Sequence, residues 1–386
     1  MMMKRRTFLL TLAGAGLGLS PIRSQTAAPS PNRLLILIAL KGGNDGLNTL
    51  IPYADPRYRI LRPDLAIPVD QVVKLSEQEG LHPQLAPLRE VWQAGELALV
   101  RGVGYPEPNL SHFRSMDIWE TASASDETLT TGWLARCFAA HSPPANLIAA
   151  GVAVGNDAAG PLQGSANALT LTDIALFQQQ ARWLGLAPST VPPNPALRHI
   201  VDVENRIRQA ASQLKRGHRF ETTFPEGPFG RALRTACEVI ASRKRASVAV
   251  VHLSLPDFDT HVRQAPRQGR LLRQLAEGLV SLRAALRELG VWNEALVMTY
   301  SEFGRRPQQN ANRGTDHGTA SIQFVLGGSV RGGFHGAALD LTNLDGNGNP
   351  HFVLDFRSLY ATVLEKWWGV ESRSVLGAQF ETVKLI

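Results

Sequence analysis

The sequence of 386 residues contains only two cysteines, Cys137 and Cys237. Two cysteines without metal-ligand spacing define neither a zinc site nor a disulfide framework, so a single bridge and two buried thiols are the alternatives. The chain also has no run of lysine and arginine with interleaved aromatic residues, which argues against a nucleic-acid partner. It has no Gly-x-Ser-x-Gly motif, which excludes the serine hydrolases that carry their nucleophile on such an elbow.

The positive charge of the chain is concentrated at its N-terminus. The formal net charge is +7, but Lys4, Arg5, Arg6 and Arg23 lie in a segment without acidic residues, and removing them leaves +3. A charge of +3 gives little reason to expect nucleic-acid binding. With 44% hydrophobic and 19% charged residues, the composition predicts a globular chain that buries a sizeable core.

The first 19 residues resemble a twin-arginine export signal. A basic start with adjacent Arg5 and Arg6 is followed by an apolar stretch too short to span a bilayer comfortably. The alternative is an amphipathic or anchor helix. We expect residues 1–30 to be a signal and connector that the twin-arginine export machinery reads. The protein would then reach the periplasm, or another exported location, already folded and without a stable transmembrane span in its mature form.

Short apolar runs followed by polar or glycine-rich residues recur along the mature chain, at residues 34–40, 97–103, 246–253, 295–300 and 322–326. Leucines at helical spacing fill residues 267–289, between the third and fourth runs, which predicts a strand, helix, strand unit with parallel strands. We therefore predict an α/β fold with a mainly parallel sheet sandwiched between helices. Residues 31–386 are expected to form a single domain, with a cap or insertion in 132–228 as an open alternative.

Four segments place acidic residues, histidines or hydroxyls just past predicted strands. Taken one at a time, such residues are turns, helix caps or surface pairs. Together they are informative, because the carboxyl ends of parallel strands meet at one edge of a sheet. Mixed carboxylate and imidazole ligands suit a divalent ion such as zinc or manganese. The residues concerned are Asp45; Ser111 with Arg114; Asp257, Asp259 and His261; and Glu302, Arg305, Asp316 and His317.

Six motifs carry a family resemblance over nearly the whole mature chain. They are residues 41–46 (KGGNDG), 111–113 (SHF), 258–261 (FDTH), 301–305 (SEFGR), 315–318 (TDHG) and 355–357 (DFR) with Tyr360. With the export signal, they resemble the bacterial domain-of-unknown-function 1501 family. That family consists of sulfatase-like exported proteins placed in the alkaline phosphatase superfamily, so the resemblance implies an alkaline phosphatase-like fold.

The superfamily pattern implies a role for each of these residues. Ser111 would be the nucleophile, and Arg114 or Arg305 would bind the equatorial oxygens of the substrate, for which a guanidinium fork is well shaped. One ion would be bound by Asp259 and His261 and another by Asp316 and His317, with Asp45 as the ligand after the first strand and Glu302 supporting an additional ion or a water.

The sequence does not fix whether one or two ions would bind, for two reasons. Asp257 has the Asp-x-x-x-His spacing of the phosphatases, whereas Asp259 fits the closer family motif, so Asp257 is held in reserve. A full two-metal phosphatase also needs a third late histidine. Only His335 and His351 are candidates for it, and neither lies in a convincing motif.

These observations favour a metal-dependent hydrolase of phosphate or sulfate esters in the cell envelope, acting on a small anionic ester or an envelope glycan. Ser111 is not followed by the x-Pro-x-Arg that formylglycine sulfatases require, so that chemistry is not expected. The alternative is a non-catalytic exported binding or structural protein that retains the fold, since a fold does not fix a function.

Overall fold

The computed structural model describes residues 32–141, 147–155, 159–184, 193–242 and 247–386. The predicted signal and connector, residues 1–30, lie outside the described residues. Among the described residues, no helix combines the length and apolar character needed to cross a membrane. Cys137 and Cys237 are both buried and free, so of the two alternatives the structure has thiols.

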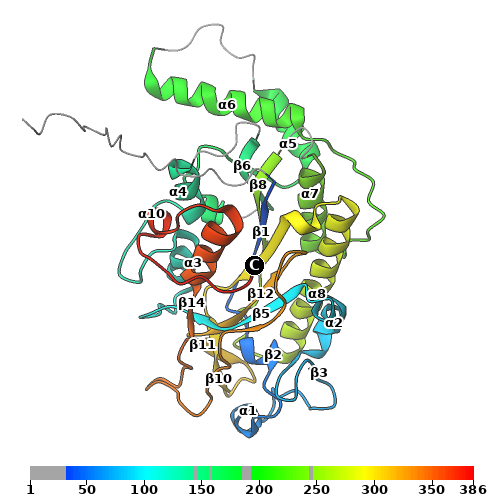
Figure 1. Cartoon of the computed structure of the whole chain (residues 1–386), viewed down its shortest axis with the longest axis vertical. Helices are drawn as coiled ribbons and strands as arrows, with labels where there is room; N and C mark the ends of the chain where they lie inside the picture. The colour runs from blue at the N-terminus through cyan, green and yellow to red at the C-terminus, as the bar shows by residue number, and fades with distance from the viewer. Residues whose placement is uncertain (1–31, 142–146, 156–158, 185–192, 243–246) are drawn as a thin grey trace, which may run out of the picture.

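A nine-stranded sheet forms the centre of the protein, in the order β13-β5-β12-β9-β1-β8-β6-β7, with β14 paired to β5 (Figure 1). The parallel pairs β9-β1, β1-β8, β8-β6 and β6-β7 make up one half of it, whereas β12 runs antiparallel to β5 and β9. The predicted mainly parallel α/β sheet is confirmed. Its strands are β1 (Leu34–Leu40), β5 (Leu97–Gly104), β6 (Leu147–Val154), β7 (Ala168–Leu171), β8 (Ser247–Leu255), β9 (Ala295–Tyr300), β12 (Ser321–Leu326), β13 (Gly333–His335) and β14 (Leu354–Asp355).

Helices cover both faces of this sheet, as the alternation of β1 shows. Leu34, Ile36 and Ile38 belong to one buried cluster and Leu35 and Leu37 to another, because successive strand residues point to opposite faces. The first cluster includes side chains of α2 (Arg89–Gln93), α5 (Ile174–Trp183), α6 (Pro195–Gln213), α7 (Gly227–Ala241) and α8 (Gln264–Glu288). The second includes α3 (His112–Thr121), α4 (Trp133–Ala140), α9 (Phe356–Thr362) and α10 (Arg373–Leu376).

The predicted crossover is confirmed, because α8 connects β8 to β9. The strand β1 lies between β8 and β9 and pairs in parallel with both. The described part of residues 132–228 contributes β6 and β7 to the sheet, and α6 lies at one end of the molecule (Figure 1). Smaller elements border the sheet. They are α1 (Pro56–Leu61), the three-stranded sheet of β2 (Leu50–Ile51), β4 (Gly80–Leu81) and β3 (Val73–Lys74), and the hairpin of β10 (Gly304–Gln309) and β11 (Thr315–Gly318).

Candidate metal centre

The loops after β1 and β8 are clamped together at the carboxyl edge of the sheet. Lys41 continues the pairing past the strand ends, because its N–H donates to the Leu255 carbonyl (3.0 Å) and its carbonyl accepts from the Phe258 N–H (2.9 Å). Gly42 has φ +111°, and a Cβ there would lie 2.4 Å from the backbone nitrogen of Asp259. Only glycine therefore lets the first loop pass so close to the second.

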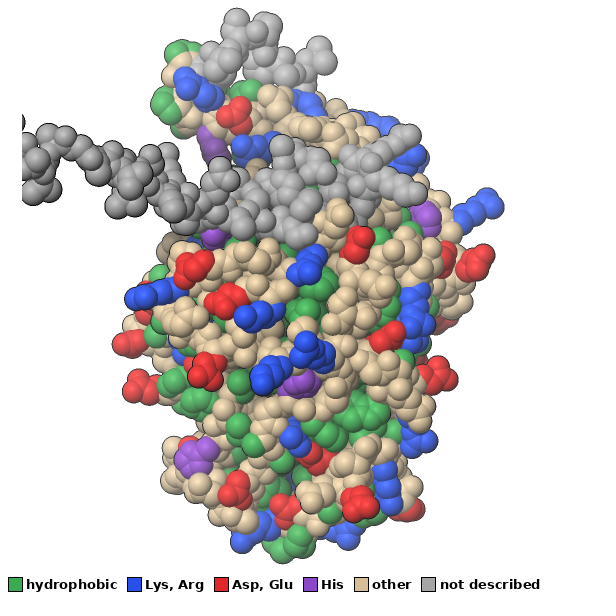
Figure 2. All heavy atoms as spheres, viewed as in Figure 1, with side chains coloured by type: hydrophobic (Ala, Val, Ile, Leu, Met, Phe, Trp, Pro, Cys, Tyr) green, Lys and Arg blue, Asp and Glu red, His purple; other side chains and the backbone are tan. Residues whose placement is uncertain are grey.

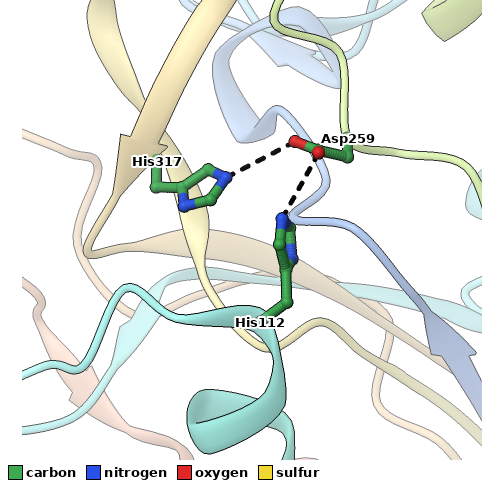
Figure 3. Close-up of side chains that lie close together, drawn as sticks. All are labelled: His112, Asp259 and His317. Carbon is green, nitrogen blue, oxygen red and sulfur yellow. Dashed lines mark hydrogen bonds and ion pairs between the residues drawn. The ribbon is translucent and has the colours of Figure 1, made fainter.

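Three side chains from distant parts of the chain meet beside these loops (Figure 3). His112 begins α3, Asp259 lies in the loop after β8, and His317 lies on β11. The Asp259 carboxylate is between the rings, with Oδ2 3.4 Å from His112 Nε2 and Oδ1 3.4 Å from His317 Nε2. Each of the three offers one ligand atom within 4.8 Å of the others.

His261 joins this group through its Nε2, which lies 3.0 Å from Asp259 Oδ1 and 2.9 Å from His317 Nε2. The Nδ1 atoms of both rings face acceptors: the Leu110 carbonyl at 2.8 Å from His317, and Asp316 Oδ1 at 3.3 Å from His261. Since a carbonyl can only accept, the His317 Nδ1 carries a proton and its Nε2 is left for another partner, whereas His261 has a carboxylate oxygen near each of its two ring nitrogens. A contact this short between two ring nitrogens needs either a proton on one of them or a cation between them.

His112 is oriented in the same way by Glu302. Glu302 Oε1 lies 2.9 Å from His112 Nδ1 and also accepts from the Gly42 N–H at 2.7 Å. The proton is thereby held at Nδ1, and Nε2 faces Asp259 without alignment for a hydrogen bond. That Nε2 atom is buried and has no hydrogen-bond partner among the described residues. A buried ring nitrogen without a hydrogen-bond partner is costly, so this atom is a place where a ligand would be favourable.

The donor set fits a divalent transition metal. Carboxylates or carbonyls hold the Nδ1 of every imidazole and leave its Nε2 available, which is the arrangement around metal-bound histidines. Three nitrogens and one carboxylate oxygen are ligands that zinc and manganese accept. The four residues that would hold the ion are His112, Asp259, His261 and His317.

Asp259 is positioned by Arg305. A terminal guanidinium nitrogen of Arg305 donates to Asp259 Oδ1 at 2.7 Å, and its other N–H groups bond the carbonyls of Gly43, Thr315 and Phe258. The Arg305 side chain is fully buried. Burial acts to raise the pKa of Asp259, but the hydrogen bond and charge of Arg305 outweigh it and lower that pKa to about 2. Asp259 is thus an ionised carboxylate held in one orientation.

The surrounding groups also shift the pKa values of the histidines. The hydrogen bond to Glu302 raises the pKa of His112, whereas burial lowers the pKa of His317. The hydrogen bond from Asn310 lowers the pKa of Asp316, which keeps that carboxylate ionised beside His261. A neutral His317 and an ionised carboxylate are the protonation states that metal ligation requires.

The structure brings together three of the predicted ligands, Asp259, His261 and His317. Glu302 and Asp316 lie next to the cluster, where they contact the Nδ1 atoms of histidines and do not join the shared centre. His112 was missed. Its signal was its place inside the Ser-His-Phe motif, directly after the predicted nucleophile, where a histidine stands beside the hydroxyl without a predicted role.

Asp45 is not part of the cluster. Its carboxylate forms a two-point ion pair with Arg62, at 2.6 Å and 2.9 Å, and both side chains are fully buried. Gln264 donates a further hydrogen bond to the same carboxylate. The prediction of Asp45 as a ligand is therefore corrected: its charge is neutralised by a guanidinium that no sequence pattern pointed to.

The remaining predicted residues also differ from expectation. Arg114 pairs with Asp117 and bonds loop carbonyls, and Arg305 is buried with its N–H groups engaged, so neither is placed to bind a substrate. Asp257 is exposed and pairs with Arg267. The late histidines lie apart from the cluster: His351 is exposed, and His335 bonds the carbonyl of Arg331.

A cleft of about 520 Å³ opens onto this candidate metal centre. His112, Asp259 and Glu302 lie in its wall, together with Phe113 and Arg267. The side chains of the four proposed ligands are between 20% and 43% exposed. A cleft of this volume can admit a small organic ligand.

Residues 98–378 match one family model, that of a protein of unknown function (DUF1501). The matched range includes every motif of the family resemblance except residues 41–46, so the resemblance is confirmed. No curated protein sequence is detectably similar to the chain.

Several solved structures are similar at low identity. The lipoteichoic acid synthase LtaP from Listeria monocytogenes has 8% identity and a TM-score of 0.38, over 81% of this chain and 68% of that one. The C-terminal periplasmic domain of EcEptC from Escherichia coli, in complex with Zn, has 10% identity and a TM-score of 0.37, over 78% and 74%. The PsFucS1 sulfatase from Pseudoalteromonas sp. has 9% identity and a TM-score of 0.35, over 90% and 68%. These similarities concern the path of the backbone and not the chemistry of the site.

Proposed function

The chain belongs to the DUF1501 family, and we propose that it holds one divalent metal ion, zinc or manganese, and hydrolyses phosphate or sulfate esters. One observation carries the proposal. The Nε2 atoms of His261 and His317 face each other at 2.9 Å beside Asp259, while both Nδ1 atoms are bonded to acceptors. A cation bound among these atoms would also satisfy His112 Nε2, which faces Asp259 and is buried without a hydrogen-bond partner among the described residues.

In this proposal the metal ion and Ser111 would have different roles in the reaction. A divalent ion in this site would act as a Lewis acid toward an ester oxygen. Ser111 immediately precedes His112, is exposed, and its hydroxyl has no hydrogen-bond partner among the described residues. Its oxygen would attack the phosphorus or sulfur atom, the alcohol would leave with the serine proton, and water would then release the anion from Ser111.

A second candidate is a metal-containing binding protein without turnover. Four protein ligands fill a tetrahedral coordination shell, as in structural zinc sites, whereas catalytic sites keep a position open. The cleft and the exposure of the ligands favour the hydrolase, because a structural ion does not need access from solvent. Either protein would carry metal, so turnover decides between them.

The test is metal analysis of the purified protein together with an ester screen. We expect about one equivalent of zinc or manganese and slow hydrolysis of a phosphomonoester, phosphodiester or sulfate ester. Ser111→Ala is expected to lower kcat by at least roughly tenfold, because it removes the nucleophile. Ser212→Ala, an exposed serine on α6, is the matched control and should keep full activity. Metal without turnover would select the binding protein, and a folded protein without metal would contradict both candidates.

We also propose that the protein is exported in folded form through the twin-arginine route, on the strength of Arg5 and Arg6 before the apolar stretch. Replacing both by lysine is expected to leave most of the protein in the cytoplasm, measured by fractionation and immunoblotting. Arg23→Lys makes the same chemical change outside the arginine pair and should not affect delivery. Unchanged export of the double variant would contradict the route.

A further inference from the structure

A second cleft, of about 760 Å³, lies beside the metal centre. It opens between α7 and α8, which pack against each other (Figure 1). Its floor includes Val154 at the end of β6, and Ser254 and Leu255 at the end of β8. The carboxyl ends of parallel strands are where α/β sheets bind their ligands.

Four arginines line this cleft, which we call the arginine cleft: Arg231 and Arg234 from α7, and Arg267 and Arg270 from α8. A spacing of three residues places each pair on one face of its helix. On the face of the molecule shown in Figure 2, basic and acidic side chains are interspersed. On this face, an anion would therefore be bound by a local group of basic side chains and not by a large basic surface.

The acidic residues of the cleft are already partnered. Glu238 pairs with Arg234 (3.6 Å), Asp257 pairs with Arg267 (3.4 Å), and Asp173 accepts from a backbone N–H at the start of α5 (2.7 Å). These two ion pairs are exposed and add little stability. They leave the other two arginines without a carboxylate.

Arg231 and Arg270 are exposed and have no hydrogen-bond or ion-pair partner among the described residues. Arg231 comes from α7 and Arg270 from α8, the two helices that border the cleft. A guanidinium has five N–H donors arranged to bind phosphate or sulfate oxygens in pairs. An anionic group that enters the arginine cleft would thus meet free donors from two sides.

The arginine cleft is next to the cleft of the metal centre, because the ion-paired side chains of Asp257 and Arg267 line both. At the metal centre, Phe113 follows the ligand His112 and is 92% exposed. An aromatic side chain this exposed in a cleft wall is a surface on which a sugar ring can pack. The two clefts together offer a reactive centre, an aromatic platform and a row of cations.

We propose that the arginine cleft binds the charged groups of an anionic glycan, with Phe113 packing against a sugar near the metal centre. The proposal rests on the proposed hydrolase function, since the ester to be cleaved would be one of the anionic groups on that glycan. A single phosphate or sulfate would reach only the metal centre. A chain that carries several such groups would engage both clefts.

The test measures binding of a labelled dextran sulfate oligosaccharide to the metal-free protein in chelator by fluorescence anisotropy. Arg231→Ala with Arg270→Ala is expected to weaken binding about tenfold, because two charge-assisted contacts are lost. Arg331→Ala with Arg373→Ala removes two exposed arginines outside both clefts and is the matched control. Phe113→Ala is expected to weaken binding of dextran sulfate and to leave binding of linear polyphosphate unchanged.

Wild-type affinity in the Arg231 and Arg270 variant, or an equal loss in the control, would overturn the proposal. Equal binding of polyphosphate and dextran sulfate by the wild type would overturn the glycan assignment. Uncharged dextran should not bind. Because no metal or turnover is involved, a failure here leaves the metal centre untouched, and a protein that binds dextran sulfate but never holds metal would contradict the proposed function alone.

Discussion

Replacing His112 by alanine is expected to lower the affinity for zinc or manganese by roughly a hundredfold or more. Structural zinc sites with four ligands bind with about 10–16 kcal/mol, so one ligand accounts for roughly a quarter of that free energy. His112 Nε2 is buried without a hydrogen-bond partner and faces Asp259, so its removal deletes a ligand and breaks no hydrogen bond made by that atom. The affinity is measured by competition with a chromophoric chelator.

Two variants calibrate this result. His335→Ala removes a late histidine that bonds only a backbone carbonyl through its ring, and it should leave the affinity unchanged. Glu302→Gln keeps the shape of the side chain that holds His112 Nδ1 but removes its charge, so we expect a loss of about tenfold, typical of groups that orient a metal ligand. Equal affinities in the His112 variant and the wild type would remove His112 from the centre.

Replacing Asp45 by asparagine is expected to destabilise the fold by about 3–5 kcal/mol while the folded protein keeps its metal, because breaking a buried ion pair leaves an uncompensated charge. The variant leaves the guanidinium of Arg62 buried, with Asn48 and two backbone carbonyls as its remaining partners. The amide also points donors at a group that only donates. Denaturant titration of the metal-free protein measures the loss, and metal competition is run separately on the folded variant.

Asp70→Asn is the matched control, since Asp70 is exposed and the substitution is the same. It should change the free energy of unfolding by less than about 0.5 kcal/mol. The opposite outcome for Asp45→Asn, normal stability with metal lost, would restore Asp45 as a ligand. The pair of measurements therefore separates a structural carboxylate from a metal-binding one.

Local sequence patterns were sufficient to predict the strands and the crossover helix that position the site. Each apolar run reads as a strand, and the leucines of α8 recur at helical spacing, so the crossover and the parallel strands follow from the chain itself. That topology brings the loops after β1, β8 and β9 to one edge. The Asp259–His261 segment could thus be placed beside the loop after β1 before any coordinates were considered.

The different roles of the polar side chains could not be predicted from local sequence patterns. Glu302 and Asp259 are both carboxylates in post-strand loops, and the sequence treats them alike. One orients a histidine and the other would bind the ion, because of where the His112 ring lies between them. Arg62 is separated from Asp45 by 17 residues, and no spacing rule connects them.

The fold class, and the edge of the sheet at which the candidate site lies, could be predicted from the order of the residues alone. Periodicity and topology are properties of the order of residues, so they can be read from it. The position of the His112 ring beside Asp259, and the burial of Asp45 against Arg62, became known only from the folded structure. Whether a side chain can bind a metal ion depends on the direction of its lone pair, and whether a charge can be buried depends on an oppositely charged partner. Both conditions depend on neighbours that the chain brings together only when it folds.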